Sequence, residues 1–67
     1  MAEPADIKER LQAIADELAD LAIARLEEAL DSGATSSPAE RRLTRARRAV
    51  EKAVAILHEP DDGADSR

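Results

Sequence analysis

The chain has 67 residues, 43% hydrophobic and 37% charged, with a net charge of −5 and neither a cysteine nor an aromatic residue. This length allows one small domain, and the absence of cysteine excludes disulfide bonds, thiolate metal sites and cysteine nucleophiles. No stretch approaches the ~18 apolar residues of a membrane span, and the first residues lack the pattern of a secretion signal. The absence of cysteine and of a targeting or spanning segment predicts a cytoplasmic protein with no membrane partner. The excess of Arg over Lys and the abundance of Ala indicate a bacterial origin.

The first helix is expected over about residues 5–32, after a short N-terminal tail at 1–5. Pro4, Asp6 and Glu9 are typical of the first helical turns, where carboxylates face the positive end of the helix dipole. Apolar residues then recur at steps of three and four, which predicts a coiled-coil-like seam. The seam consists of Ile7, Leu11, Ile14, Leu18 and Leu21.

This seam fails near the C-terminal end of the first helix. Continued by the same steps, it would reach Arg25 and Glu28. The apolar face shifts around the helix instead, to Ile23, Leu26 and Leu30. At ~100° per residue the apolar arc spans roughly 200°, about twice the arc that one packing partner covers. A single neighbouring helix therefore cannot cover it.

The interior loop is expected at residues 33–37. Gly33 suits the left-handed backbone position that closes a helix. Ser37 and Glu40 have the spacing of a capping box, in which each side chain accepts a hydrogen bond from the other residue's backbone N–H. Pro38 fits the first helical turn, where its missing N–H costs nothing. The loop therefore ends at a well-marked start of a second helix.

The second helix is expected over about residues 38–58. Its apolar residues step by three and four along one seam, which consists of Ala39, Leu43, Ala46, Val50, Ala53 and Leu57. Pro60 restricts the residue before it and ends the helix. The remaining residues 59–67 have almost nothing to bury, so we predict a disordered acidic tail there.

The short loop predicts an all-α fold in which residues 6–58 form an antiparallel, coiled-coil-like two-helix hairpin. A lone hairpin would leave half of each apolar face in water. We therefore expect a homodimer in which two hairpins pair into a four-helix bundle. The expected dimer interface consists of Ile23, Arg25, Leu26 and Leu30. Docking of the hairpin on a different protein is the alternative.

Few residues could support catalysis. His58 is the only histidine, and its place in the last turn of the second helix suits a cap or a surface position. The pairs Glu17/Asp20 and Glu28/Asp31 have an E-x-x-D spacing found in some Mg²⁺-binding helices. They lie roughly 16 Å apart on one helix and point away from its apolar arc. We expect no enzymatic activity, no metal and no cofactor.

Charge is divided unequally between the two helices. Residues 1–37 carry nine acidic and three basic side chains, whereas residues 38–58 carry six basic and two acidic ones. Four of the bases recur at steps of four and three on the side of the second helix opposite its seam. This basic stripe consists of Arg41, Arg45, Arg48 and Lys52.

Three interpretations of the basic stripe remain open. It can be a solvated face, it can meet an acidic protein surface, or it can follow the phosphate backbone of a nucleic acid. A second copy of the chain offers an acidic stripe formed by Asp16, Asp20, Glu27 and Asp31. Nucleic acid is the least favoured partner, because no aromatic residue can stack on bases and the net charge is negative. We predict a non-enzymatic self-association or protein-interaction module, with nucleic-acid binding through the basic stripe as the alternative.

Overall fold

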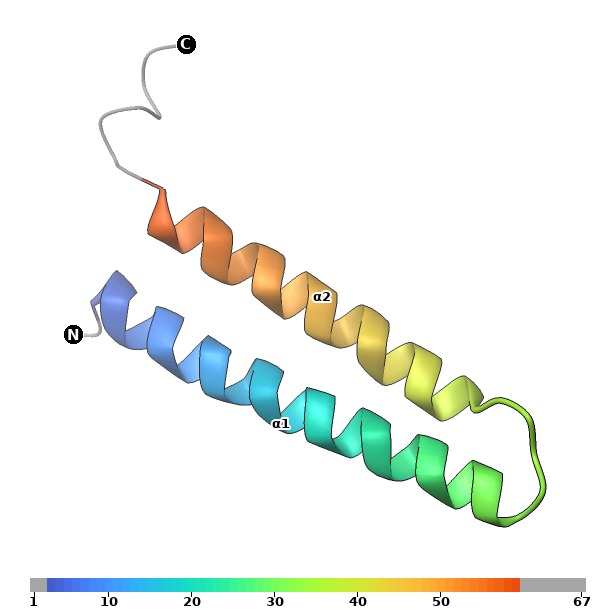
Figure 1. Cartoon of the computed structure of the whole chain (residues 1–67). Coiled ribbons are helices and arrows are strands. Elements are labelled where there is room, and N and C mark those ends of the chain that lie inside the picture. Colours follow the sequence, from blue (N-terminus) through green and yellow to red (C-terminus); the bar gives the residue numbers. More distant parts are fainter. Residues whose placement is uncertain (1–2, 60–67) are drawn as a thin grey trace, which may run out of the picture.

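The structure of the chain, a computed structural model, describes residues 3–59. It consists of two helices, α1 (Pro4–Asp31) and α2 (Pro38–His58), that run antiparallel and pack against each other along their lengths (Figure 1). No strand occurs among the described residues. The expected all-α hairpin is therefore confirmed. The predicted tail over 59–67 lies outside the described residues except for Glu59.

The first helix ends where its last carbonyl groups find backbone donors. The N–H of Gly33 donates to the carbonyl of Leu30 at 3.0 Å, and the N–H of Ala34 donates to the carbonyl of Ala29 at 2.9 Å. This pair of bonds is the Schellman motif, in which the residue after the C-cap of the helix adopts a left-handed conformation. The C-cap is Ser32, so that residue is Gly33. Gly33 has a φ of 91°, as its position in the sequence predicts.

Ser37 starts the second helix. Its hydroxyl accepts a hydrogen bond from the N–H of Glu40 at 3.0 Å, and Ser37 is the one polar residue that is buried among residues 3–59. The other half of the expected capping box is wrong, because the Glu40 carboxylate accepts a 2.8 Å bond from the Thr44 hydroxyl instead. The cap therefore depends on Ser37 alone.

The two helices meet along a line of small residues on α1. Ala15 and Ala22 are the only hydrophobic residues of 3–59 that are buried, with 5% and 6% of their surfaces exposed. Leu18 and Leu26 of α1 and Val50 of α2 are only half-buried. The backbone spans 53 × 27 × 12 Å, so the hairpin is a plate about one helix thick that leaves two broad flanks open.

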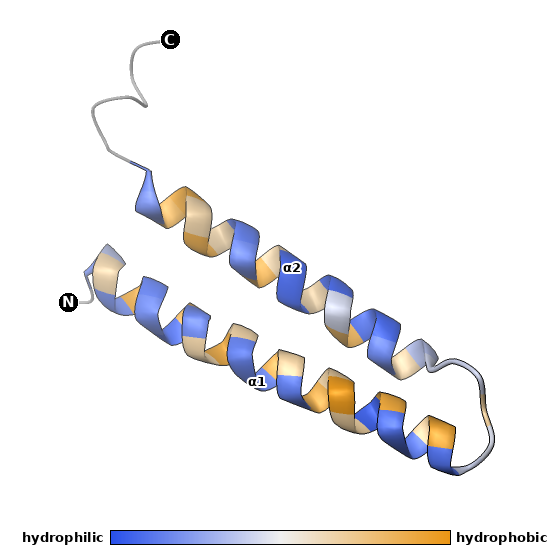
Figure 2. Cartoon of the chain, in the orientation of Figure 1, coloured by the Kyte–Doolittle hydropathy of each residue, from blue (hydrophilic) through white to orange (hydrophobic). Residues whose placement is uncertain are grey.

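Hydrophilic and hydrophobic residues alternate in bands along both helices (Figure 2). Neither helix of the described chain has the length and continuous apolar character needed to cross a membrane.

Candidate functional site

Exposed large side chains follow α1 on both sides of its buried alanine line. Leu21 and Ile23 lie next to Ala22 in the sequence, so they project about 100° to either side of it. Leu21 is 39% exposed and Ile23 is 57% exposed. The two flanks on either side of this line differ in polarity, because α2 contributes different residues to each.

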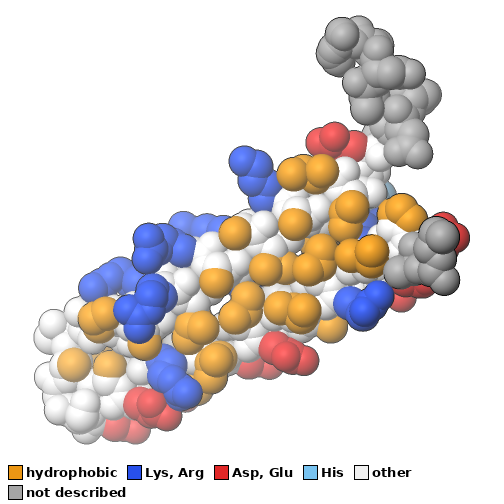
Figure 3. Space-filling view, turned by 180° about the vertical axis from the view of Figure 1, so that it is seen from behind, with side chains coloured by type: hydrophobic (Ala, Val, Ile, Leu, Met, Phe, Trp, Pro, Cys, Tyr) orange, Lys and Arg blue, Asp and Glu red, His pale blue; other side chains and the backbone are white. Residues whose placement is uncertain are grey.

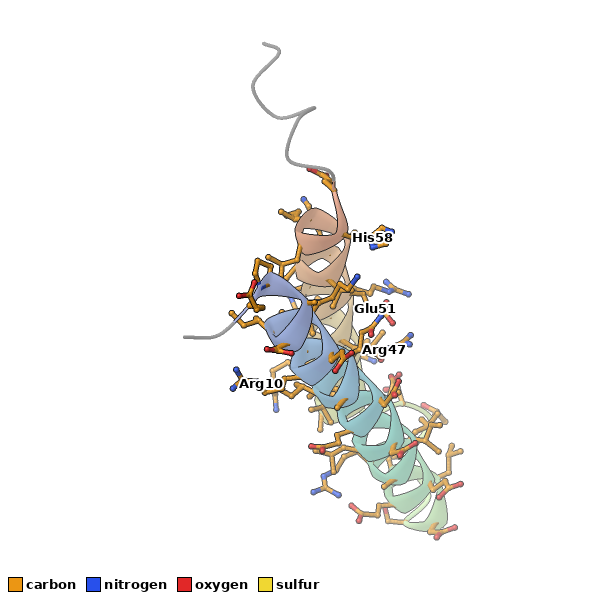
Figure 4. The ribbon with its side chains drawn as sticks, turned by 90° about the vertical axis from the view of Figure 1, so that its left-hand side faces the viewer. Arg10, Arg47, Glu51 and His58 are labelled. Carbon is orange, nitrogen blue, oxygen red and sulfur yellow. The ribbon has the colours of Figure 1, made fainter. Side chains whose placement is uncertain are left out.

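The first flank, which we call the polar flank, is marked by two shallow grooves between the helices. One groove is lined by Gln12, Ala15, Asp16, Glu51 and Val54, and the other by Ala19, Ala22, Ile23, Glu40, Thr44 and Arg47. The Arg47 guanidinium donates to the Glu51 carboxylate at 3.2 Å. Figure 4 shows Arg47, Glu51 and His58 on this side of the hairpin and Arg10 on the opposite side.

The second flank, which we call the apolar flank, lies on the other side of the alanine line. From α1 it carries Ile7, Ile14 and Leu21, which are spaced seven residues apart and are 38%, 44% and 39% exposed. On α2, Ala46 and Ala53 come two residues after Thr44 and Glu51, and two residues turn a helix by about 200°. Ala46 and Ala53 therefore face away from the polar flank.

The seam expected for α2 lies on this apolar flank. Its members are half-buried, except Ala46 and Leu57, which are exposed: Ala39, Leu43, Ala46, Val50, Ala53 and Leu57. Figure 3 shows the result, a face on which hydrophobic side chains cover the middle of both helices while charged side chains lie mainly toward its edges. The apolar flank is thus the face of the described hairpin on which apolar residues of both helices predominate.

The residues expected to form the dimer interface are divided between the flanks. Ile23 lines a groove of the polar flank, Leu30 is 54% exposed seven residues further on, and Leu26 is half-buried. Arg25 follows Leu21 by one helical turn and so belongs with the apolar flank. Its guanidinium donates to the Glu28 carboxylate at 3.2 Å. The structure does not bring these four residues together in one surface.

The basic stripe lies on exposed α2 surface. Arg41, Arg45, Arg48 and Lys52 are all exposed, and none of them forms an ion pair with another described residue. A shallow concavity of about 530 Å³ covers its first part and is lined by Pro38, Glu40, Arg41, Arg42, Thr44, Arg45 and Arg48. The stripe is therefore a concentration of positive charge on the outer edge of the plate, away from the centres of both flanks.

His58 contacts α1 at the end of the hairpin opposite the loop. Its Nδ1 lies 3.0 Å from Nζ of Lys8, so the Lys8 ammonium can donate to an unprotonated Nδ1. His58 is exposed, and among the described residues no group of three His, Cys, Asp or Glu side chains has the arrangement of a metal site. The contact joins the first turns of α1 to the last turn of α2.

No family model matches the chain, and neither a curated protein nor a solved structure matches it.

Proposed function

We propose that this chain is a non-enzymatic self-association module in which two hairpins pair through their apolar flanks to form a four-helix bundle. The observation that carries the proposal is the absence of an interior: no Leu, Ile or Val of residues 3–59 is buried within the hairpin. Burial of such side chains is the main favourable term in folding. A hairpin that fully buries only two alanines, and leaves its larger apolar side chains half-buried or exposed, therefore needs a second apolar layer.

The apolar flank offers that layer better than the surface around Ile23. Both helices contribute apolar residues to it, and the two seams follow the same steps of three and four. Ile23 lies beside Glu40, Thr44 and Arg47, whose polar groups would lose water without gaining partners if that groove were covered. The proposed interface therefore lies on the opposite side of α1 from Ile23 and Leu30, and not on the expected surface of Ile23, Leu26 and Leu30.

A second copy is the proposed partner of the apolar flank. A two-fold axis places two identical flanks face to face and closes the assembly, which is the commonest arrangement of small homo-oligomers. The resulting four helices would enclose both seams, as in antiparallel four-helix bundles. Docking on a different protein would instead require a partner with a complementary apolar surface.

Light scattering coupled to gel filtration tests the proposal. At micromolar concentration we expect twice the chain mass of 7.2 kDa, together with a helix content that falls on dilution because folding and association are coupled. A folded monomer of 7.2 kDa with a cooperative melting transition would overturn the proposal. An unfolded monomer would favour docking on a different protein.

A second candidate function follows from the basic stripe. Its four side chains are exposed and have no carboxylate partner among the described residues, so they are free to neutralise phosphates. Fluorescence anisotropy with duplex and single-stranded oligonucleotides at about 150 mM salt tests this function, and we expect no binding tighter than ~10⁻⁵ M. Submicromolar binding that is lost when Arg41, Arg45, Arg48 and Lys52 are changed to Gln would make nucleic-acid binding the leading function.

A further inference from the structure

We infer that the two hairpins pair with their loops at the same end of the bundle, so that α1 of each copy lies against α2 of the other. The inference rests on the proposed self-association and specifies how the second copy is seated. It follows from three features of the hairpin. These are the positions of residues along the helix axis, which we call their heights, the sizes of the side chains on the apolar flank, and the charges of the two helices.

The heights are fixed by contacts across the hairpin. Lys8 is level with His58, whose Nδ1 lies 3.0 Å from Nζ of Lys8. Ala15 and Glu51 line one groove, and seven residues further along α1, Ala22 lines the next groove with Thr44. Each step of seven residues along α1 thus matches a step of seven residues back along α2.

The same relation gives the heights of the residues on the apolar flank. Ile14 precedes Ala15 by one residue, so it is level with Lys52 and Ala53, which follow Glu51. By the same reasoning Leu21 is level with Ala46 within about one residue, or ~1.5 Å along the helix. The large residues of α1 therefore stand at the heights of alanines on α2.

Two arrangements can place the apolar flanks face to face by two-fold symmetry. An axis parallel to the helices keeps every height unchanged, puts the two loops at the same end and lays α1 over α2 of the other copy. An axis perpendicular to the helices in the plane of the interface reverses the second copy. It puts the loops at opposite ends and lays α1 over α1 and α2 over α2.

Side-chain size favours the first arrangement. With the loops at the same end, Leu21 of one copy comes level with Ala46 of the other, and Ile14 comes level with Ala53. Large side chains then meet small ones at both heights, as close packing requires. With the loops at opposite ends, the stripe of Ile7, Ile14 and Leu21 meets the same stripe on α1 of the other copy. Ala46 and Ala53 of α2 then meet the same alanines of the other copy. The alanine side would then retain space that nothing fills.

Charge favours the same arrangement. Nine acidic and three basic residues precede Pro38, whereas six basic and two acidic residues lie in α2. Laying α1 over α2 of the other copy brings helices of opposite net charge together, and laying α1 over α1 brings two negative helices together. Side-chain size therefore carries the choice of arrangement. Charge adds only a weaker, longer-range preference in the same direction, because the basic stripe lies on the outer edge of the plate and charges at such distances are screened by salt.

A distance between spin labels on two copies tests the inference directly. The chain has no cysteine, so Thr35→Cys in the exposed loop provides a single attachment site. With the loops at the same end, double electron–electron resonance should give a label separation of about 15–30 Å, since packed helix axes lie roughly 8–10 Å apart. With the loops at opposite ends, the separation should be about the ~42 Å length of α1.

Glu3→Cys, at the open end of the hairpin, is the matched second site. Both labels should give short distances in the inferred arrangement, and dilution with unlabelled chain should remove the signal because the distance joins two copies. Long distances at both sites in a particle of dimer mass would overturn this inference and leave the proposed self-association intact. A monomer mass with no distance at either site would overturn both.

A size exchange across the interface provides a second measurement. Ala46→Leu and Leu21→Ala should each weaken the dimer by about tenfold, the first by overpacking and the second by leaving a cavity. The double variant should recover to within about threefold of the unmodified chain, because its large and small residues have only changed places. Ala55→Leu, at an exposed position of α2 outside the apolar flank, is the control. A double variant weaker than both single variants would contradict the inference.

Discussion

The two flanks of the hairpin show how little separates an interaction surface from an ordinary solvated one. Leu21 and Ile23 are neighbours on α1, flank the same buried alanine and both expose a large aliphatic side chain. Beside Leu21, α2 places Ala46 and the other residues of its seam. Beside Ile23, it places Glu40, Thr44 and Arg47. Around Ala22 the character of each flank is therefore set mainly by α2, although α1 carries most of the large apolar residues.

The largest expected effect comes from placing charge on the apolar flank. Ile14→Glu combined with Leu21→Glu should abolish the dimer and cost about 4 kcal/mol or more of stability, because two carboxylates would have to be buried or the interface lost. The measurements are molar mass by light scattering and helicity by circular dichroism.

Ile23→Glu combined with Leu30→Glu is the matched control on the opposite side of α1. Both residues are more than half exposed in the hairpin, so we expect a change within about 1 kcal/mol and an unchanged mass. The reverse outcome, with a monomer from the control and a dimer from the apolar-flank variant, would restore Ile23, Leu26 and Leu30 as the interface.

A change at the loop should lower the stability of the whole hairpin without acting on either flank. Ser37→Ala removes the hydroxyl that accepts from the Glu40 N–H, and we expect a loss of about 1 kcal/mol in chemical denaturation with the molar mass unchanged. Ser36→Ala, at the exposed neighbouring position, should change stability by less than about 0.3 kcal/mol. Equal effects of the two substitutions would show that the cap contributes nothing.

Arg25 allows the apolar flank to be improved. It stands where the seam of α1 calls for an apolar residue, and its guanidinium is held by Glu28 in an ion pair that is largely exposed. Because exposed pairs contribute little, Arg25→Leu should raise the stability of the dimer, by up to about 1 kcal/mol in thermal unfolding. Arg25→Gln should give no such gain. Strong destabilisation by the leucine would instead assign Arg25 to an ion-pair network that the dimer needs.

The smallest effect is expected on the polar flank. Arg47 and Glu51 are one turn apart on α2, so Arg47→Gln should cost only about 0.3–0.5 kcal/mol. The difference from the unmodified chain should shrink further in 1 M salt, where such pairs are screened. A loss above about 1.5 kcal/mol would mean that this flank is covered by a partner.

Much of the fold follows from local rules that need only the sequence. The steps of three and four define both helices, Gly33 supplies the positive φ of the helix end, and Ser37 supplies the cap, each by chemistry confined to a few neighbouring residues. The expected bounds, 5–32 and 38–58, differ from the observed ones by one residue at each end of α1.

The orientation of the helices about their own axes could not be predicted in this way. The expected seam of α1 runs through Ile14 and Leu21, yet the most buried residues of α1 are Ala15 and Ala22, so the seam is turned toward the apolar flank. Small residues let two backbones approach, and this gain competes with burial of larger residues in a manner that a single helix's periodicity does not record. The choice of Ile23, Leu26 and Leu30 as an interface depended on that orientation.

The two ends of the loop are tied down, and the residues between them are free for other uses. The backbone bonds of Gly33 and Ala34 complete α1, and the Ser37 hydroxyl begins α2, while Thr35 and Ser36 are exposed. A peptide inserted between Thr35 and Ser36 would disturb neither cap, and each doubling of loop length costs only about 0.6 kcal/mol in closure entropy. This position is therefore suited to carrying an epitope, an affinity tag or a second folded domain at the tip of the hairpin.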